Sequence, residues 1–550
     1  MNKKNFTSKI KLYDVTLREG SQAEGVYFSI KDKLKIIHLL DEIGMDYIEG
    51  GWPGTNPKDT DLYNIMKGEK LDNAVLVAFG MTRRVDNKVE DDPFLEALIK
   101  TEVEHVNIFA KGWDFHVREV LKITLEQNLE LVYDSIQYLK RYIPNVSLGI
   151  EHFFDGYKAN PEYIVRLIKV AEDAGAIWVG AADTNGGCLP DEVYRILTET
   201  RKISKLVRAV HIHQDSGLAI AATMKAIECG ADILHGTING IGERCGITDF
   251  CTLIPNLQFK MGINCISGVQ VKRLREIAYI VAECGGFDVY KYSPYVGESA
   301  FSHKGGIHVD AVLKNPMTYN HIVPEWVGNK YTTTVSELSG KANIFYWASR
   351  YGINIDKNDL RIVNLLNYIK KQERKGLRFD EADASRFILF KYFIDNYKPN
   401  IKVKDFSLSI NKEWRGDLTH LEEEKEIIDM NIFLRLIINK EIEEISVICK
   451  TNPFMILSRI VKEIVGKYYK DLVDYIKIIG FKIQKSDYFY EHSDSQRVSL
   501  VLKAVDLSLN ETYCTIGISY DIYSAFLKAF IDVFEYKILK NNGENKRSEV

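Results

Sequence analysis

Residues 11 to 19 read Lys11-Leu12-Tyr13-Asp14-Val15-Thr16-Leu17-Arg18-Glu19, an apolar run that stops at two charged residues. Short runs of this kind, bounded by polar residues, are typical of buried strands. Similar runs recur through the first 260 residues, separated by longer amphipathic stretches such as 32–43 and 161–174. This alternation predicts repeated βα units and a parallel sheet.

Eight such runs are present, and eight βα units close into a TIM (β/α)8 barrel. An open, doubly wound sheet is the rival α/β architecture. However, no Gly-x-Gly-x-x-Gly motif follows an early strand, and no Gly-x-x-x-x-Gly-Lys-[Ser/Thr] motif occurs. We therefore expect a catalytic barrel over residues 1–264. The predicted strands are 9–17, 46–51, 74–80, 105–110, 146–153, 176–182, 208–214 and 233–238.

The remaining chain predicts two further parts, because 550 residues exceed one ordinary core. Residues 265–398 are expected to form a linker subdomain, irregular and Gly-rich over 265–345 and then helical at 358–371 and 381–396. A turn-rich boundary follows at Tyr397-Lys398-Pro399-Asn400. Residues 399–540 predict an α+β domain for regulation or dimerisation. Its predicted strands are 405–410, 445–450, 498–505 and 513–519, with helices at 453–467 and 521–538.

Composition limits the partners. The net charge of −4 leaves no electrostatic footprint for nucleic acid, and no apolar run is long enough to span a bilayer. The N-terminus is polar and lacks the apolar region of a signal peptide. The eight cysteines form no Cys-x-x-Cys pair, which argues against a zinc ribbon or a disulfide framework. We expect small-molecule partners and a cytoplasmic location.

His211-Ile212-His213 predicts a metal site. Alternate side chains of a strand share a face, so both imidazoles can point into the barrel and chelate one divalent ion. Glu19, after the first strand, supplies a carboxylate, and this ligand set leaves positions open for water and substrate. The alternative is a pair of hydrogen-bonded core histidines.

Other strand ends are also polar, at the edge where barrel enzymes build their active sites. Glu49 could be a site residue or the partner of a buried Lys or Arg. Carboxylates such as Glu151 are rarely buried unless they are paired or chemically employed. The remaining polar strand ends are Arg18, Lys111, His152, Asp183, Thr184, Asn239 and the loop 240–244.

Residues 13–22 resemble the Asp-Thr-Thr-Leu-Arg-Asp-Gly-x-Gln signature of the α-isopropylmalate, homocitrate and citramalate synthases. The His-x-His-x-Asp segment at 211–215 and the Gly-rich loop at 240–246 match the same family. The resemblance covers almost the whole chain and is closest to the long-form branch of the citramalate synthases. The segments that carry this closer likeness are 47–54, 151–158, 183–187 and 302–308.

The resemblance implies an acyltransferase that condenses acetyl-CoA with a 2-oxo acid, with pyruvate as the favoured acceptor, in isoleucine biosynthesis. A divalent ion (Mg, Mn or Zn), held by Glu19, His211 and His213, would polarise the ketone. The resemblance also implies a homodimer whose C-terminal domain senses an amino-acid effector. It assigns catalytic roles to Arg18, Glu151 and His308, and substrate binding to Gln22, Thr184 and Asp310.

Three positions depart from the family pattern. Glu19 replaces an aspartate, a change that is usual in homocitrate synthases, and Gln214 replaces an asparagine. Ile247 stands where the family has an asparagine near the metal, and its side chain cannot ligate. Four functions therefore remain open beside citramalate synthesis: an isopropylmalate synthase, a homocitrate synthase, a metal-dependent aldol lyase, and a regulatory paralogue with impaired catalysis.

Overall fold

The computed structural model describes residues 9–333, 339–356, 359–374, 377–415, 425–450, 452–484, 497–509 and 511–545. The chain forms two compact units. The first contains Met1–Phe301 and Asn320–Tyr331, and the second contains Ser302–Tyr319 and Thr332–Val550. Among the described residues, no helix combines the length and the apolar character that a membrane span needs.

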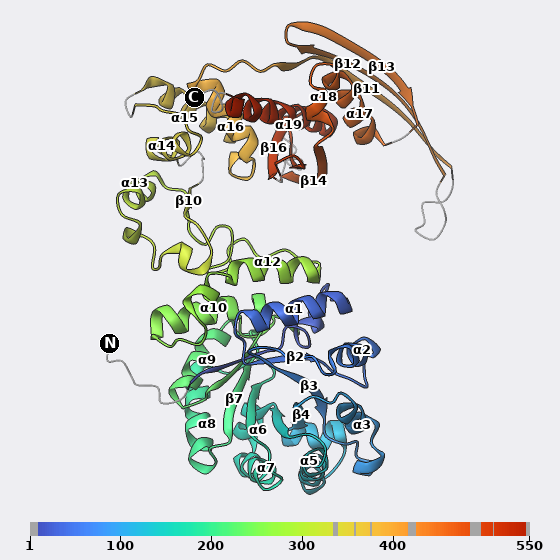
Figure 1. Ribbon diagram of the computed structural model, residues 1–550, viewed down its shortest axis with the longest axis vertical. Coiled ribbons are helices and arrows are strands. Elements are labelled where there is room, and N and C mark those ends of the chain that lie inside the picture. The colour runs from blue at the N-terminus through green and yellow to red at the C-terminus, as the bar shows by residue number, and fades with distance from the viewer. Residues whose placement is uncertain are drawn as a thin grey trace. The chain divides into compact units, whose positions relative to one another are not determined.

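The first unit is built around a closed barrel of eight parallel strands (Figure 1). The strands follow one another in chain order, and β1 pairs with both β2 and β8. The second pairing closes the sheet, which rules out the open alternative and confirms the predicted barrel. The strands are β1 (Lys11–Asp14), β2 (Tyr47–Gly51), β3 (Val75–Met81), β4 (His105–Lys111), β5 (Asn145–Glu151), β6 (Val179–Asp183), β7 (Val207–Ile212) and β8 (Ile233–Gly236).

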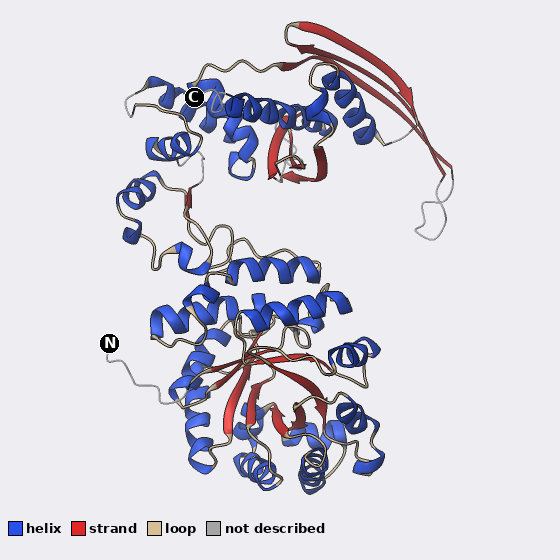
Figure 2. Cartoon of the chain, in the orientation of Figure 1, coloured by secondary structure: helices blue, strands red, loops and turns tan. Residues whose placement is uncertain are grey.

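Helices surround these strands (Figure 2). Local signals begin several of them: the Ser29 side chain caps α1, while Asn56, Asp92 and Asn160 each cap a helix that starts with proline. The longer helices of this unit are α1 (Ile30–Glu42), α2 (Pro57–Met66), α3 (Pro93–Lys100), α5 (Leu125–Leu139), α7 (Pro161–Asp173), α8 (Pro190–Ile203), α9 (Ala219–Glu228) and α12 (Leu274–Gly285).

Aromatic rings fill the barrel interior at the amino ends of the strands. The Trp178 ring lies 5.2 Å from the Tyr47 ring and 4.6 Å from the His105 ring, measured between centroids. These side chains are buried. The barrel is therefore a packed core at this end, and only its carboxyl end has room for a ligand.

The second unit combines helices with two three-stranded antiparallel sheets, ordered β11-β12-β13 and β14-β15-β16. The predicted C-terminal α+β domain is confirmed. The elements are α13 (Gly306–Lys314), α14 (Lys341–Arg350), α15 (Leu360–Glu373), α16 (Asp383–Ile394), β11 (Ile401–Arg415), β12 (Lys425–Ile438), β13 (Glu441–Cys449), α17 (Pro453–Gly466), α18 (Lys470–Val473), β14 (Ile476–Gln484), β15 (Val498–Asp506), β16 (Glu511–Ser519) and α19 (Ile522–Asn545).

Some elements differ from the prediction. The segment 265–345 is not wholly irregular, because it contains α12 and α13. The sequence also fails to predict β12 and β14; the nearly continuous apolar run 432–438 in β12 fits a buried helix as well as a strand. Phe387 and Ile388 of α16 share a core with residues of α19. The domain boundary at residue 398 stays a prediction.

Candidate active site

A cavity of about 350 Å³ opens at the carboxyl end of the barrel. It gathers most of the residues that the sequence predicts for the site, and its lining residues lie on or directly after all eight strands. This convergence is what a parallel barrel provides, because all its strands end at the same rim. The side chains that line it include Arg18, Glu19, Gln22, Trp52, Phe79, Asn107, Phe109, Glu151, Thr184, His211, His213, His235, Glu243 and Arg244.

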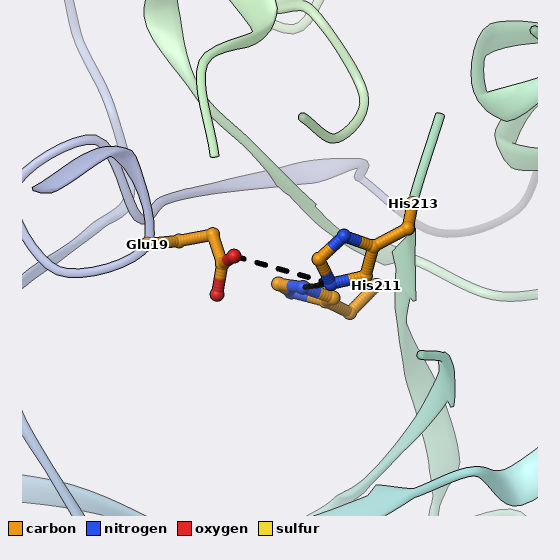
Figure 3. A group of neighbouring side chains, drawn as sticks. All are labelled: Glu19, His211 and His213. Carbon is orange, nitrogen blue, oxygen red and sulfur yellow. Dashed lines mark hydrogen bonds and ion pairs between the residues drawn. The ribbon is translucent and has the colours of Figure 1, made fainter. Parts of the chain in front are cut away.

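Glu19, His211 and His213 form one cluster in this cavity (Figure 3). The two histidine Nε2 atoms lie 3.3 Å apart, and Glu19 Oε1 lies 4.0 Å from His213 Nε2. Both imidazoles point to the same side of the chain, as the i, i+2 spacing predicts. Glu19 does not sit on the strand itself, because β1 ends at Asp14 and a turn carries the chain to Glu19.

The pKa shifts of these three side chains favour the protonation states that can bind a cation. Burial lowers the pKa of His211 to about 3, with a further contribution from His213, and burial also lowers the pKa of His213. Both rings are therefore neutral at pH 7 and offer a lone pair. Burial raises the pKa of Glu19, but Arg18 and the two imidazoles lower it more, to about 2. The carboxylate is charged.

The spacing of the three ligand atoms fits a divalent ion. Ligands at about 2.1 Å from a tetrahedral ion lie roughly 3.4 Å from one another, close to the observed separation of the two Nε2 atoms. The Glu19 oxygen needs to approach by only about half an ångström to reach that spacing. His213 Nδ1 is buried and has no hydrogen-bond partner among the described residues.

The loop after β8 contacts the cluster of Glu19, His211 and His213. The backbone N–H of Glu243 donates to Glu19 Oε1 at 3.2 Å. Gly246 has a φ of +84°, and a Cβ there would lie 1.9 Å from the Gly240 carbonyl oxygen, so this turn requires glycine. Arg244 forms a two-point ion pair with Asp215, at 2.7 and 3.0 Å. The turn and this ion pair hold the loop against the segment that follows β7.

The two unusual residues near the metal cluster have structural roles. Gln214 Oε1 accepts from the backbone N–H of Ala219 at 2.9 Å, at the start of α9. Ile247 is 1% exposed, pairs with His213 in an isolated β-bridge, and packs in an apolar cluster with residues such as Val15. The side chain that replaces asparagine therefore belongs to the core and offers no ligand atom.

Arg18 is fixed between two carboxylates. Its Nε donates to Glu49 Oε1 at 2.6 Å and its Nη1 to Glu19 Oε2 at 2.5 Å, while the Phe79 ring centroid lies 4.0 Å from its Cζ. Glu49 is fully buried and also accepts from the Tyr13 hydroxyl at 2.7 Å. Burial alone would lower the pKa of Arg18, but the two carboxylates raise it above the ordinary value. Arg18 therefore brings a permanent charge to the cavity.

Glu151 and Thr184 line another part of the cavity. Lys111 Nζ forms an ion pair with Glu151 Oε2. The backbone N–H of His152 donates to Thr184 Oγ1 at 2.7 Å. Because the Thr184 oxygen already accepts, its own hydroxyl proton is available to a ligand in the cavity.

The other predicted site residues, His308 and Asp310, lie on α13 of the second unit. Their roles stay predictions. The sequence does not single out five residues that line the cavity. Of these five, Asn107 is the one that the sequence could have identified, because it is a polar residue inside a buried strand. The five residues are Trp52, Phe79, Asn107, Phe109 and His235.

Comparisons with known proteins identify the family of this chain. Residues 9–281 match the HMGL-like family model, and residues 295–376 match the model described as homocitrate synthase post-HMGL domain-like. An (R)-citramalate synthase of Aquifex aeolicus is 40% identical over 98% of this chain and 99% of its own length. That of Geobacter sulfurreducens is 39% identical over 97% and 98%. A 2-isopropylmalate synthase of Sulfolobus acidocaldarius is 32% identical over 69% of this chain and 94% of its own. The chain therefore belongs to the citramalate synthase branch of the isopropylmalate and homocitrate synthase family.

Proposed function

We propose that this protein condenses acetyl-CoA with pyruvate to give citramalate and CoA. One observation carries the proposal: a single cavity gathers a carboxylate, two neutral imidazoles and a fixed guanidinium. The full-length likeness to proteins named (R)-citramalate synthase supports it. In the reaction, the methyl carbon of acetyl-CoA loses a proton and bonds to the ketone carbon of pyruvate. The ketone oxygen gains a proton, and water then cleaves the thioester.

Glu19, His211 and His213 would hold a divalent ion (Mg, Mn or Zn). Such an ion, when bound, polarises the ketone of a chelating 2-oxo acid. Two imidazoles and one carboxylate form a ligand set that leaves positions open for substrate. The proposal covers all three ions, and the assay below compares them.

Arg18 and Thr184 bind the acceptor. The guanidinium of Arg18 stabilises negative charge as it develops on the ketone oxygen, and it costs no reorganisation because Glu49 already holds it in place. Thr184 donates its free hydroxyl proton to a carboxylate oxygen of the 2-oxo acid. Gln22, which lines the same cavity, contributes a further polar contact.

Glu151 takes part in activating acetyl-CoA. Its carboxylate faces the cavity and is about a quarter exposed, so it can accept a proton from the acetyl methyl group directly or through another base. Its Oε2 forms an ion pair with Lys111 Nζ. The resemblance assigns His308 and Asp310 to the same step, and these roles remain part of the proposal.

Three aromatic rings favour a small acceptor. Trp52 lies 5.4 Å from Phe79 and 5.6 Å from Phe109, and the two phenylalanine rings are 5.5 Å apart, all between centroids. Because each ring packs against the other two, none moves aside alone. A branched or charged substituent that faced these rings would have to displace them, at a cost of about 1–3 kcal/mol for each added group. For this reason we favour pyruvate, which carries one methyl group.

The test is thiol release from acetyl-CoA with pyruvate, 2-oxobutyrate, 2-oxoisovalerate or 2-oxoglutarate, each with Mg²⁺, Mn²⁺ or Zn²⁺. We expect the highest kcat/KM with pyruvate. Faster release with 2-oxoisovalerate or 2-oxoglutarate would instead identify an isopropylmalate or homocitrate synthase. Cleavage of a hydroxy-keto acid without CoA would identify an aldol lyase, and no release at all would identify an impaired paralogue.

Three further properties complete the proposal: a homodimer, an amino-acid effector that binds the C-terminal domain, and a cytoplasmic place in isoleucine biosynthesis. They rest on the family resemblance. Inhibition of thiol release by isoleucine or leucine, and the mass of the protein in solution, would test the first two.

A further inference from the structure

A second group of metal-ligating side chains lies beside the cavity, apart from Glu19 and its partners. One ring nitrogen of His116, one of His152 and one carboxylate oxygen of Glu151 all lie within 4.8 Å of one another. His116 ends the short helix α4 (Asp114–His116) after β4, and His152 directly follows β5. Two neighbouring βα loops of the barrel thus bring three ligand atoms together.

The His152 ring is already oriented as a metal ligand. Its Nδ1 lies 2.9 Å from Asp155 Oδ2, and a carboxylate accepts, so Nδ1 carries the proton and Nε2 keeps its lone pair. Asn185 donates to the same Asp155 oxygen at 3.0 Å. A carboxylate behind a histidine is the usual outer partner of metal-binding imidazoles, because it fixes the tautomer and raises the basicity.

His116 offers a second imidazole. Burial lowers its pKa, and the nearby His152 lowers it further. Its Nδ1 is buried and has no hydrogen-bond partner in the part of the chain that the structure describes. The two imidazoles lie 4.5 Å apart between centroids.

The backbone at His152 has an uncommon conformation that places this ring. His152 has φ 54° and ψ 38°, a left-handed conformation that few residues other than glycine adopt, with Asn, Asp and His the most frequent among them. Residues held in this conformation cluster at functional sites. The hydrogen bond from the His152 N–H to Thr184 ties this turn to the rim of the cavity.

We infer that His116, His152 and Glu151 form a second divalent-cation site, which binds Zn²⁺ or a similar transition-metal ion. Two imidazoles and a carboxylate are a common zinc ligand set, and imidazoles favour Zn²⁺ over Mg²⁺. The ion pair with Lys111 uses Glu151 Oε2, which leaves Oε1 for the ion. Glu19 shows the same arrangement, with Arg18 on one of its two oxygens.

The second cation site has a consequence for catalysis, because Glu151 belongs both to this site and to the cavity. An ion bound by Glu151 neutralises the carboxylate that faces the cavity. Excess Zn²⁺ therefore inhibits the enzyme while a lower concentration fills the first site. This consequence rests on the proposed role of Glu151, whereas the binding itself does not.

Isothermal titration of the metal-stripped full-length protein with Zn²⁺ tests the inference. The wild type should bind two equivalents per chain, and His116→Asn should bind one. His152→Asn should also bind one, since asparagine tolerates the left-handed backbone. His213→Ala, which removes the first site instead, should bind one. The matched control is His38→Asn, which replaces an exposed histidine that pairs with Glu69 and lies outside both clusters, and this variant should still bind two.

One equivalent in the wild type would overturn the inference, as would two equivalents in both His116→Asn and His152→Asn. A drop in the His38→Asn control would do the same, because it would assign the second equivalent to surface binding. Circular dichroism shows whether each variant folds. If either His116→Asn or His152→Asn fails to fold, the number of equivalents bound by the remaining variant tests the inference. In thiol release, His116→Asn should resist the excess Zn²⁺ that slows the wild type. If neither the wild type nor any variant releases thiol, the proposed function fails, but the number of bound Zn²⁺ equivalents still tests the second site.

Discussion

Glu49→Gln isolates the residue that holds Arg18 in place. The substitution keeps the volume of the side chain but removes the charge that faces the guanidinium at 2.6 Å. An amide also brings two N–H donors to a place where Tyr13 and Asn107 already donate, at 2.7 and 3.3 Å. The amide cannot satisfy all three neighbours as the carboxylate does.

The expected losses of stability and of activity follow from these contacts. Removing one partner of a buried ion pair costs about 3–5 kcal/mol, and a hydrogen bond to a charged group is worth about 1.5–3 kcal/mol. Glu19 still pairs with Arg18, and the amide oxygen can still accept, so we expect the free energy of unfolding to fall by about 2–3 kcal/mol. Because Arg18 also loses its fixed orientation, kcat should fall by about 10- to 100-fold, while the KM for the 2-oxo acid changes less.

Urea unfolding and thiol release measure these two effects. Glu126→Gln is the matched control, because Glu126 pairs with Arg166 on the surface of the same unit. Exposed ion pairs contribute little to stability, so the control should keep the wild-type midpoint and rate. Equal behaviour of Glu49→Gln and the control in both assays would refute the role of Glu49 in positioning Arg18.

Three other predictions address the metal ligands, the loop and a buried acid. His213→Ala should abolish thiol release and reduce metal uptake while circular dichroism stays unchanged; a wild-type rate would remove the metal assignment. Gly246→Ala should lower the free energy of unfolding by about 1–3 kcal/mol and slow turnover, because its Cβ meets a carbonyl oxygen; a variant with the wild-type urea midpoint would contradict this. Burial raises the pKa of Asp14 to about 7, although hydrogen bonds from Thr16 lower it. The native state therefore keeps this proton at higher pH than the unfolded state, and stability falls by about 4 kcal/mol as pH rises from 4 through 7. Asp14→Asn should flatten this fall in urea midpoints between pH 4 and 8; parallel curves would disprove the assignment.

Local sequence was enough to predict the barrel. The strands are short apolar runs, and several helices have their own start signal, such as Asn160 before Pro161. The C-terminal unit was harder. The apolar run of β12 carries no clear period, and only its pairing with β11 and β13 makes it the central strand of a sheet. Local sequence preferences do not predict which strands pair with one another.

The cluster of Glu19, His211 and His213 was also predictable, because the i, i+2 spacing of the two histidines in extended backbone at the end of β7 places both rings on the same face. Sequence could not decide what surrounds it. The partner of Arg18, the packing of Ile247 in the core and the meeting of His116 with His152 all depend on which βα loops become neighbours when the barrel closes. The sequence by itself thus determined the fold class and the family, and it singled out the candidate metal ligands. Only the tertiary structure decided which charges pair and which side chains face the cavity, because these contacts join residues from different strands and loops, which come together only in the folded chain.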